Sequence, residues 1–361
     1  MAGSFQGRAY LNRIASAVPP NDVHDAFVRF ANRLLDDPRH EKLFRRMVDR
    51  ADIHHRYSVL APSPDGMSGT MVDADGFYRF GAFPPTSERM RRYQAAALPL
   101  ALAAVDRLGL GAAVRQASHL IVTSCTGLYA PGLDIELAAA LGIAPSVERT
   151  MVGFMGCYAA FNALKLARHI VRSDPAARVL IVNLELCTLH LHETNDLEQI
   201  LSFLVFADGC AAAWVTAEPG GLVLDRFRTV LLPESADLIT WRVGDQGFDM
   251  MLSGKVPAAI AAGLRPAAAE ILDGATVPEI DLWAVHPGGR SVLDAVQGAL
   301  ELPPSALDAS RRVLADFGNM SSATIMFVLE RLMAGAMPGQ RGAAMGFGPG
   351  LTAETLLFRA A

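Results

Sequence analysis

Cys157 has the surroundings of a reactive cysteine. Small residues, Gly156 and Ala159 among them, flank it, and the segment 161–170 that follows is rich in helix formers. A cysteine at the start of a helix lies near unpaired backbone N–H groups and the positive end of the helix dipole, and both favour thiolate over thiol. Such a position would make the sulfur more nucleophilic, because a free cysteine with a pKa of about 8.5 is mostly protonated at neutral pH. Considered alone, the motif fits an ordinary buried cysteine equally well.

Two further residues complete a candidate set. His286 follows an apolar segment and precedes Pro287 and two glycines, and Asn319 lies in a Gly-Asn turn just ahead of a helix-forming run. Each has a simple structural explanation by itself, since asparagine, for example, tolerates the left-handed backbone of a turn. Cysteine, histidine and asparagine together are a known catalytic set that recurs on unrelated folds. Their shared placement in small-residue loops favours one active site.

Composition restricts the class of protein. The chain has 361 residues, 51% hydrophobic and 19% charged, so sizeable cores in one large or two ordinary domains are expected. A net charge of −5 without a basic stripe argues against nucleic-acid binding. The four cysteines show no CxxC spacing, which suits a reducing cytosol. The first residues lack a signal-peptide core, and the longest apolar runs stop short of the ~20 residues of a membrane span, so we expect a soluble cytoplasmic protein.

Short apolar segments alternate with longer helical ones. This alternation predicts an α/β fold, and strands that are apolar throughout indicate a sheet covered by helices on both faces. The expected strands are 119–124, 179–186, 211–216, 222–232, 282–285, 342–346 and 354–358, and the expected helices are 22–35, 41–51, 87–108, 134–141, 157–172, 256–272, 289–300 and 322–334. A strand, a small-residue turn and a helix recur in both parts of the chain. With the turn-rich segment 218–221 between them, this repeat predicts two related halves, 1–218 and 219–361.

With these residues in place, the chain resembles the type III polyketide synthases, the chalcone and stilbene synthase-like branch of the thiolase superfamily, and among them the bacterial type. The likeness extends over essentially the whole chain. Its most specific segment, residues 346–355, is similar to the family's C-terminal Gly-Phe-Gly-Pro-Gly signature. The contexts of Cys157, His286 and Asn319 match the family's three catalytic motifs. The resemblance implies a five-layer αβαβα fold of the thiolase type and a tight homodimer.

The resemblance also implies a reaction. Such an enzyme loads an acyl-CoA starter on its cysteine, extends it by decarboxylative Claisen condensation with malonyl-CoA, and cyclises the polyketide to a pyrone, a resorcinol or another polyphenol. Coenzyme A thioesters are the substrates, so no bound cofactor and no acyl carrier protein are expected. His286 and Asn319 are the expected donors to the developing negative charge, and we expect His286 to lower the pKa of Cys157 through an ion pair. Long-chain aliphatic starters are favoured over priming by malonyl-CoA alone.

Other positions take their roles from the same resemblance. Phe206 matches a gating phenylalanine. The family's second gating phenylalanine has no clear match here: Phe248 is nearby, and Met250 is the better alignment. The segment 41–50 resembles the family's basic helix that meets coenzyme A. Arg46 and Arg50, four residues apart and so on one helix face, are the expected contacts to its phosphates, with a solvated basic face as the alternative. An isolated His-x-His pair at 190–192 lacks a third ligand at metal-binding spacing, so no metal is assigned. The remaining expected cavity residues are Cys125, Cys187 and His190.

Three alternatives stay open from the sequence. A β-ketoacyl synthase III-like condensing enzyme would use the same three residues, and a need for acyl carrier protein would identify it. A cysteine hydrolase is weaker, because the interval from Cys157 to His286 is near that of papain-like proteases but the local signature is missing. A non-catalytic scaffold on this fold would bury three polar groups at a cost of ~1–3 kcal/mol for each one left unpaired.

Overall fold

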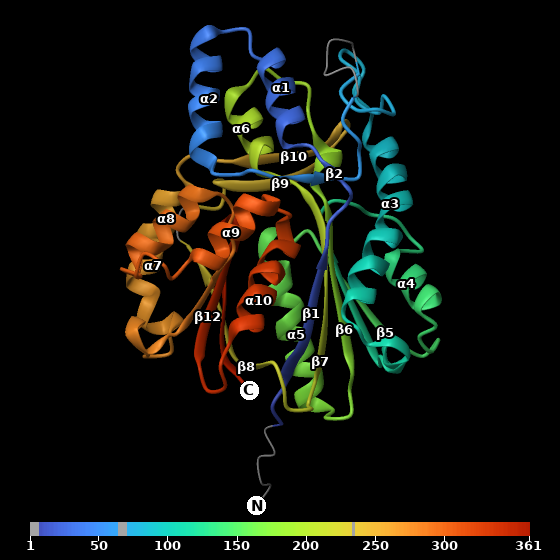
Figure 1. The fold of residues 1–361 in the computed structure, drawn as a ribbon, viewed down its shortest axis with the longest axis vertical. Helices are drawn as coiled ribbons and strands as arrows, with labels where there is room; N and C mark the ends of the chain where they lie inside the picture. Colours follow the sequence, from blue (N-terminus) through green and yellow to red (C-terminus); the bar gives the residue numbers. More distant parts are fainter. Residues whose placement is uncertain (1–6, 64–70, 233–234) are drawn as a thin grey trace, which may run out of the picture.

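The computed structural model describes residues 7–63, 71–232 and 235–361, and one mixed sheet runs through this part of the chain (Figure 1). Its strand order is β11-β12-β13-β8-β1-β7-β6-β4-β5. β8 pairs with β1 only at Tyr10 and Leu11, so the sheet divides there into two layers. The strands are β1 (Tyr10–Ala17), β4 (His119–Ser124), β5 (Glu148–Gly153), β6 (Val179–Leu186), β7 (Asp208–Thr216), β8 (Leu222–Leu231), β11 (Leu282–Val285), β12 (Arg341–Gly348) and β13 (Thr352–Ala360).

Helices cover both sheet layers and fill the space between them. Two outer helices pack on the N-terminal layer, two more pack on the C-terminal layer, and α5 and α10 lie in the middle (Figure 1). Alternate residues of one strand belong to different cores: Val122 packs with α3, and Ile121 packs with α5. The predicted αβαβα fold is confirmed. The outer and middle helices are α3 (Thr86–Arg107), α4 (Leu133–Leu141), α5 (Ala159–Ser173), α7 (Val256–Ile271), α8 (Arg290–Ala299), α9 (Asp308–Phe317) and α10 (Thr324–Gly335).

A smaller group of elements caps one end of the sheet (Figure 1). Phe44 of α2 packs against Ile200 and Leu204 of α6 in a separate apolar cluster. A two-stranded hairpin lies below these helices and above the ends of the long strands. The cap consists of α1 (His24–Leu34), α2 (Pro38–Ala51), α6 (Leu197–Val205), the short strands β2 (Asn21–Asp22) and β3 (Tyr57–Ser58), and the hairpin strands β9 (Ile239–Gly244) and β10 (Gly247–Leu252). In the described part of the chain, no helix has the length and apolarity needed to cross a membrane.

Every helix and strand expected from the sequence is present, with ends that differ by a few residues. The pattern did not reveal β1, β5, α6, α9 or the β9–β10 hairpin. β5 was missed because it is an edge strand whose first four residues are exposed and largely polar, so it lacks the apolar run that marks a buried strand. The division of the chain at 218 and 219 stays a prediction.

Candidate active site

The turn after β5 places Cys157 at the start of a helix. Phe154 and Gly156 both have positive φ, 54° and 71°, and a short 3₁₀ turn, η2 (Gly156–Tyr158), then leads into α5. A Cβ atom at Gly156 would lie 2.2 Å from Cδ of Pro349, so only glycine fits there. The backbone N–H of Gly156 also donates to Sγ of Cys125 at 3.0 Å. The predicted location of the cysteine at a helix start is confirmed.

His286 enters the same region from the end of β11. Its backbone N–H donates to the carbonyl of Met345 on the neighbouring β12 at 2.8 Å, which fixes the residue in register with the sheet. The imidazole is buried, and neither Nδ1 nor Nε2 has a hydrogen-bond partner among the described residues. Buried polar side chains are nearly always paired, so an imidazole without partners indicates a group held ready for a ligand.

Asn319 is held by its backbone between α9 and a second 3₁₀ turn, η5 (Ser321–Ala323). Its N–H donates to the carbonyl of Val205 at 2.7 Å, and its own carbonyl accepts from Ala207 at 2.9 Å. The side-chain oxygen accepts from the N–H of Ser321 at 2.9 Å. The side-chain amide donates to the carbonyl of Gly288 at 3.3 Å, which ties Asn319 to the loop that follows His286.

Asn319 links the loop after His286 to the thiol, because its side-chain amide bonds to Gly288 and also contacts Cys157. The thiol of Cys157 interacts with the side chains of Ser321 and Asn319. Two glycines of β12 let this strand pack closely against the segments that carry His286 and Cys157. A Cβ at Gly346 would lie 3.4 Å from Cβ of His286, and a Cβ at Gly348 would lie 3.3 Å from the backbone nitrogen of Cys157. A Cβ at these two glycines would lie even closer to Phe161 and Tyr158, at 2.7 and 2.6 Å, so larger residues here would displace the segments that carry His286 and Cys157.

Burial sets the charges in this site. Burial raises the pKa of the Cys157 thiol to about 11, and the carboxylate of Glu185 raises it further. The contacts of the thiol with Ser321 and Asn319 lower its pKa but do not offset the burial. Burial also lowers the pKa of His286 to about 3. The expected ion pair, with a lowered cysteine pKa, is therefore wrong for the unliganded site. Its physical basis is missing, because the imidazole is unpaired and the thiol's contacts are a neutral hydroxyl and a neutral amide.

A cavity lies over the sulfur, and most of the expected cavity residues line it. Cys125, Cys187, Phe206 and Met250 are all in its walls. His190 is not: it is fully buried behind Trp241 and Phe248. The lining residues that the sequence analysis missed include Trp241 and Ser321. Ser321 could have been found from its position two residues after Asn319, whereas no local signal marks Trp241.

A second, larger cavity adjoins the first. It lies between α1 and the segments 58–62 and 72–73, and it shares Cys187 and Phe206 with the site cavity. Its walls are predominantly apolar and include Phe27, Phe30, Leu60, Val72, Leu191 and Phe203. The two residues common to both cavities therefore separate the Cys157 sulfur from the second, apolar cavity.

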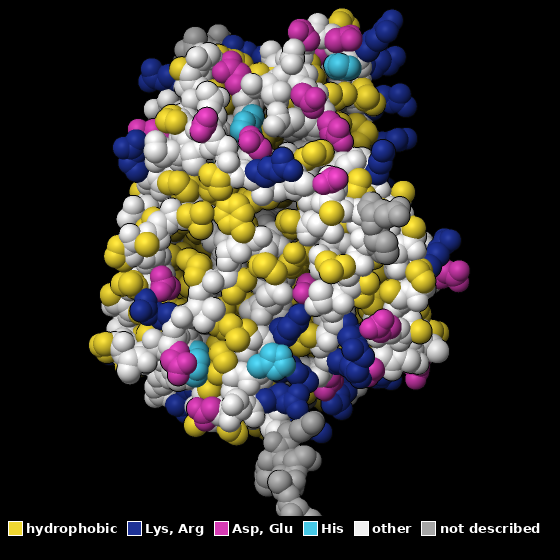
Figure 2. All heavy atoms as spheres, turned by 180° about the vertical axis from the view of Figure 1, so that it is seen from behind, with side chains coloured by type: hydrophobic (Ala, Val, Ile, Leu, Met, Phe, Trp, Pro, Cys, Tyr) yellow, Lys and Arg dark blue, Asp and Glu magenta, His cyan; other side chains and the backbone are white. Residues whose placement is uncertain are grey.

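Arg46 and Arg50 lie on the exposed face of α2, outside both cavities. Basic side chains gather along the edge of the molecule where α2 lies, at the upper right of Figure 2. Arg290, which begins α8, donates to the carbonyl of Arg50 at 3.4 Å, so this end of α2 is adjacent to the loop after His286. Within the described residues, no group of three or more histidine, cysteine, aspartate or glutamate side chains is arranged to hold a metal ion.

This fold places the chain among the thiolase-like condensing enzymes. Residues 2–219 match the family model "Chalcone and stilbene synthases, N-terminal domain", and residues 224–361 match the C-terminal domain of the same description. The chain therefore belongs to the chalcone and stilbene synthase family and is a type III polyketide synthase, an acyltransferase of the condensing type.

Individual relatives agree with this assignment. The chain is 34% identical to the "Alpha-pyrone synthesis polyketide synthase-like Pks18" of Mycobacterium tuberculosis over 97% of this chain and 91% of that protein. It is 32% identical to the bisdemethoxycurcumin synthase of Oryza sativa over 98% of this chain and 93% of that protein. The structure of PKS-I from the brown alga Ectocarpus siliculosus has a TM-score of 0.84 at 30% identity and covers 98% of each chain. The type III domain of Steely1 from Dictyostelium has a TM-score of 0.88 at 21% identity, covers 98% of this chain and 99% of that one, and shares the fold.

Proposed function

We propose that Cys157 accepts the acyl starter from coenzyme A and that His286 and Asn319 stabilise the negative charge that develops in both half-reactions. The observations that carry the proposal are the thiol in contact with Asn319, the bond from Asn319 to the loop that follows His286, and the buried imidazole of His286 with no partner among the described residues. In loading, the cysteine sulfur forms a bond to the thioester carbon and coenzyme A leaves with a proton. In extension, malonyl-CoA loses carbon dioxide, the enolate attacks the acyl carbon, and the cysteine sulfur is released.

The neutral resting pair determines how the thiol is activated. Because burial keeps Cys157 protonated and His286 unprotonated, the imidazole is the base that takes the thiol proton when the thioester arrives. It then returns that proton to the leaving coenzyme A sulfur. In the extension step the neutral imidazole, in its N–H tautomer, and the Asn319 amide are donors to the enolate oxygen.

The starter we propose is a long-chain aliphatic acyl-CoA, and the product a pyrone or a resorcinol. The apolar cavity behind Cys187 and Phe206 supports this choice, since an alkyl chain bound to Cys157 would gain burial there. The name of the mycobacterial relative, which refers to α-pyrone synthesis, points in the same direction. Phe206 and Met250, on the walls of the site cavity, would act as the gate residues.

Coenzyme A would bind at the end of α2 near the loop after His286. Arg46 and Arg50 are exposed there, and guanidinium groups pair well with phosphates. We propose that both substrates arrive as coenzyme A thioesters, with no acyl carrier protein and no further cofactor. The four cysteines are free thiols, which supports a cytoplasmic location.

We also propose a homodimer formed through β5. This strand ends the sheet, pairs only with β4 within the described residues, and so leaves a row of backbone groups without partners. Three large apolar side chains near it, Leu128, Ile135 and Met151, are more than 40% exposed in the single chain. A second copy would satisfy the edge and cover these side chains.

The direct test is incubation of the protein with malonyl-CoA and a panel of acyl-CoA starters, followed by mass spectrometry of the products. The proposal predicts triketide and tetraketide products from long-chain starters without any carrier protein. A parallel reaction with malonyl-loaded acyl carrier protein is the informative control. Condensation only in that reaction would contradict the proposal and indicate the β-ketoacyl synthase III-like alternative.

A further inference from the structure

Arg56 is a buried arginine in the wall of the second, apolar cavity. It precedes β3, only 2% of its surface is exposed, and it lines this cavity together with Phe27 of α1. Its guanidinium carbon lies 4.6 Å from the centroid of the Phe27 ring. A guanidinium group therefore borders a space whose other walls are mainly apolar. This burial needs an explanation, because arginine is almost never fully buried unless it is paired.

The hydrogen bonds of Arg56 use only part of its guanidinium group. Nη1 donates to the carbonyls of Phe203 and Phe206 at 3.0 and 2.6 Å. Nε donates to Nδ1 of His24 at 3.1 Å, and burial lowers the pKa of that histidine to about 4, so its imidazole is neutral and can accept. Nη2 is buried and has no hydrogen-bond partner among the described residues. These contacts hold the group in place and leave one donor nitrogen for a ligand.

The positive charge of Arg56 also lacks a partner. Burial lowers its pKa to about 9, so the group is still charged at neutral pH. The carboxylates of Asp22 and Asp208 raise this pKa through their charge, but both are bonded to other groups. Asp22 lies 2.7 Å from Nδ1 of His55, and Asp208 accepts from the backbone N–H of Thr188 at 2.8 Å. A buried charge without an ion pair is costly, and a carboxylate on a ligand would remove that cost.

The other polar groups of this cavity wall already have partners. Asp73 accepts from the backbone N–H of Tyr78 at 2.7 Å, and the hydroxyl of Tyr78 donates to the carbonyl of Thr188 at 2.9 Å. The hydroxyl oxygens of Ser58 and Thr188 lie 2.7 Å apart. Of the described residues that line the cavity, only Arg56 has a buried side-chain nitrogen or oxygen without a partner.

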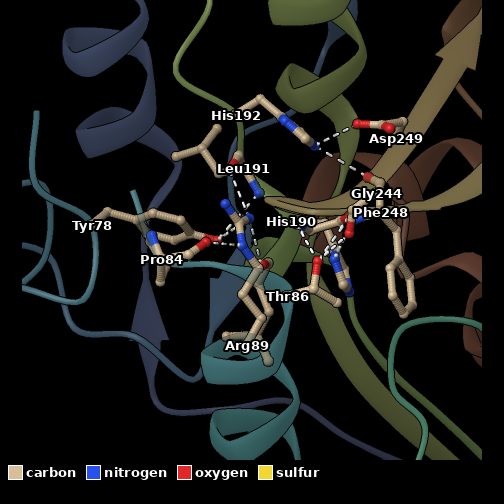
Figure 3. Close-up of polar contacts among 12 residues, drawn as sticks. Tyr78, Pro84, Thr86, Arg89, His190, Leu191, His192, Gly244, Phe248 and Asp249 are labelled. Atoms are coloured by element: carbon tan, nitrogen blue, oxygen red, sulfur yellow. Dashed lines mark hydrogen bonds and ion pairs between the residues drawn. The ribbon is translucent and has the colours of Figure 1, made fainter. Parts of the chain in front are cut away.

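Arg89 of α3 is a second fully buried arginine, and it shows the contrasting case. Its Nη1 donates to the carbonyl of Leu191 and its Nε to that of Pro84, both at 2.8 Å. Figure 3 shows the guanidinium group reaching toward Tyr78 and Leu191, so it joins separate segments of the chain. Nη2 of Arg89 also lacks a partner within the described residues, but Arg89 lines neither cavity. The position in a cavity wall therefore distinguishes Arg56 as a group that can bind a ligand.

We propose that Arg56 binds a carboxylate that an alkyl chain carries into the second cavity. The carboxylate would accept from Nη2 and pair with the charge, and the chain would pack on apolar walls such as Phe30 and Leu60. Arg56 is bonded to the backbone of Phe206, which lines both cavities, so the bound carboxylate would lie on the side of the cavity next to the active site.

Two kinds of molecule carry this chemistry. One is a free fatty acid, which would occupy the cavity and compete with long-chain starters. The other is the coenzyme A monothioester of a long-chain dicarboxylic acid, whose far carboxylate would reach Arg56 while its thioester meets Cys157. The second source rests on the proposed polyketide-forming activity, whereas the first does not.

Calorimetric titration tests the binding without any reaction. Decanoate and decanol have the same chain length and differ in the charged head. We expect the wild type to bind decanoate about 10–100-fold more tightly at neutral pH, as for one hydrogen bond between charged groups. A free fatty acid suffices as the probe, because its carboxylate and chain are the two parts that the cavity would recognise.

Variants of Ala26, which precedes Phe27 and lines the same cavity, test the role of the charge while Arg56 keeps its bonds. Ala26→Glu supplies a carboxylate inside the cavity and should abolish the preference for decanoate over decanol. Ala26→Gln, equal in size but uncharged, is the matched control and should keep the preference. Arg56→Met, which removes the donors and the charge, should also abolish it and decides the matter if neither Ala26 variant binds a ligand.

Kinetics with acyl-CoA starters distinguishes the two sources. Dicarboxylic monothioesters that exceed alkyl starters of equal length by about tenfold in kcat/KM, with a sharp optimum in chain length, would identify the starter as the source of the carboxylate. Preference for alkyl starters with competitive inhibition by decanoate would identify the free fatty acid. If the wild type converts no acyl-CoA, the proposed function fails, while the titration still tests the site.

Two results would overturn the inference. One is equal affinity of the wild type for decanoate and decanol, or no binding of either. The other is a preference for decanoate that persists in both Ala26→Glu and Arg56→Met, which would place the bound acid outside this cavity.

Discussion

The floor and the wall of the active-site cavity are built in different ways. On the floor side, Cys157 lines the cavity, His286 is bonded through its backbone to β12, and Asn319 is bonded through its backbone to the segment 205–207. The wall is a two-stranded hairpin outside the main sheet, and His190 and Trp241 fasten it through side chains. Backbone hydrogen bonds therefore fix two of the groups that we propose to be catalytic, whereas the position of the wall depends on a few side-chain contacts.

The largest expected effect tests the floor. Cys157→Ala removes the acyl acceptor and should lower product formation by at least ~10³-fold, while some malonyl-CoA decarboxylation persists because His286 and Asn319 remain. Product formation and carbon dioxide release are measured together by chromatography and a coupled assay. Cys210→Ala, at a buried β7 cysteine outside both cavities, is the matched control and should stay active. Elongation at the normal rate by Cys157→Ala would rule out covalent catalysis by Cys157.

The next effect concerns the two donors. His286→Gln and Asn319→Ala should each lower kcat for malonyl-CoA decarboxylation by about 10²–10³-fold, the usual loss when one donor to a developing oxyanion is removed. Stability by thermal unfolding must be followed in parallel for Asn319→Ala, since its side-chain oxygen also accepts from Ser321. A decarboxylation rate unchanged in both variants would show that other groups stabilise the enolate.

The passage between the two cavities gives a selective effect. Cys187→Phe adds bulk where both cavities meet and should reduce kcat/KM for long-chain starters by about 10–100-fold relative to short ones. Ala61→Leu, deeper in the apolar cavity, should shorten the preferred starter more gently. An equal loss for short and long starters in both variants would place the acyl chain elsewhere.

The pH dependence of thiol labelling gives the smallest effect. Because burial raises the pKa of Cys157 to about 11, the thiolate fraction in the free protein should rise about tenfold per pH unit between pH 7 and pH 9. The rate of iodoacetamide modification at Cys157, followed by peptide mass spectrometry, should rise with it. A plateau below pH 8 would reveal a thiolate already stabilised at neutral pH and would restore the ion pair with His286.

The same contrast explains what the sequence could and could not predict. Cys157, His286 and Asn319 each stand in a local pattern of small residues after a strand or before a helix, so short-range signals were enough. Trp241 and His190 acquire their positions through contacts with residues far away in the chain, such as Phe248 and Thr126, and no local pattern records such pairs. The charge state of the thiol was likewise out of reach, because burial follows from packing of the whole fold.

The central claim, that Cys157 carries the acyl chain, is tested most directly by the intact mass of the protein after incubation with a long-chain acyl-CoA in the absence of malonyl-CoA. The account predicts a mass increase of one acyl group, located by proteolysis to the peptide that contains Cys157 and absent from Cys157→Ala. An acyl group found on another residue, or product formation by a protein that never acquires the added mass, would contradict it.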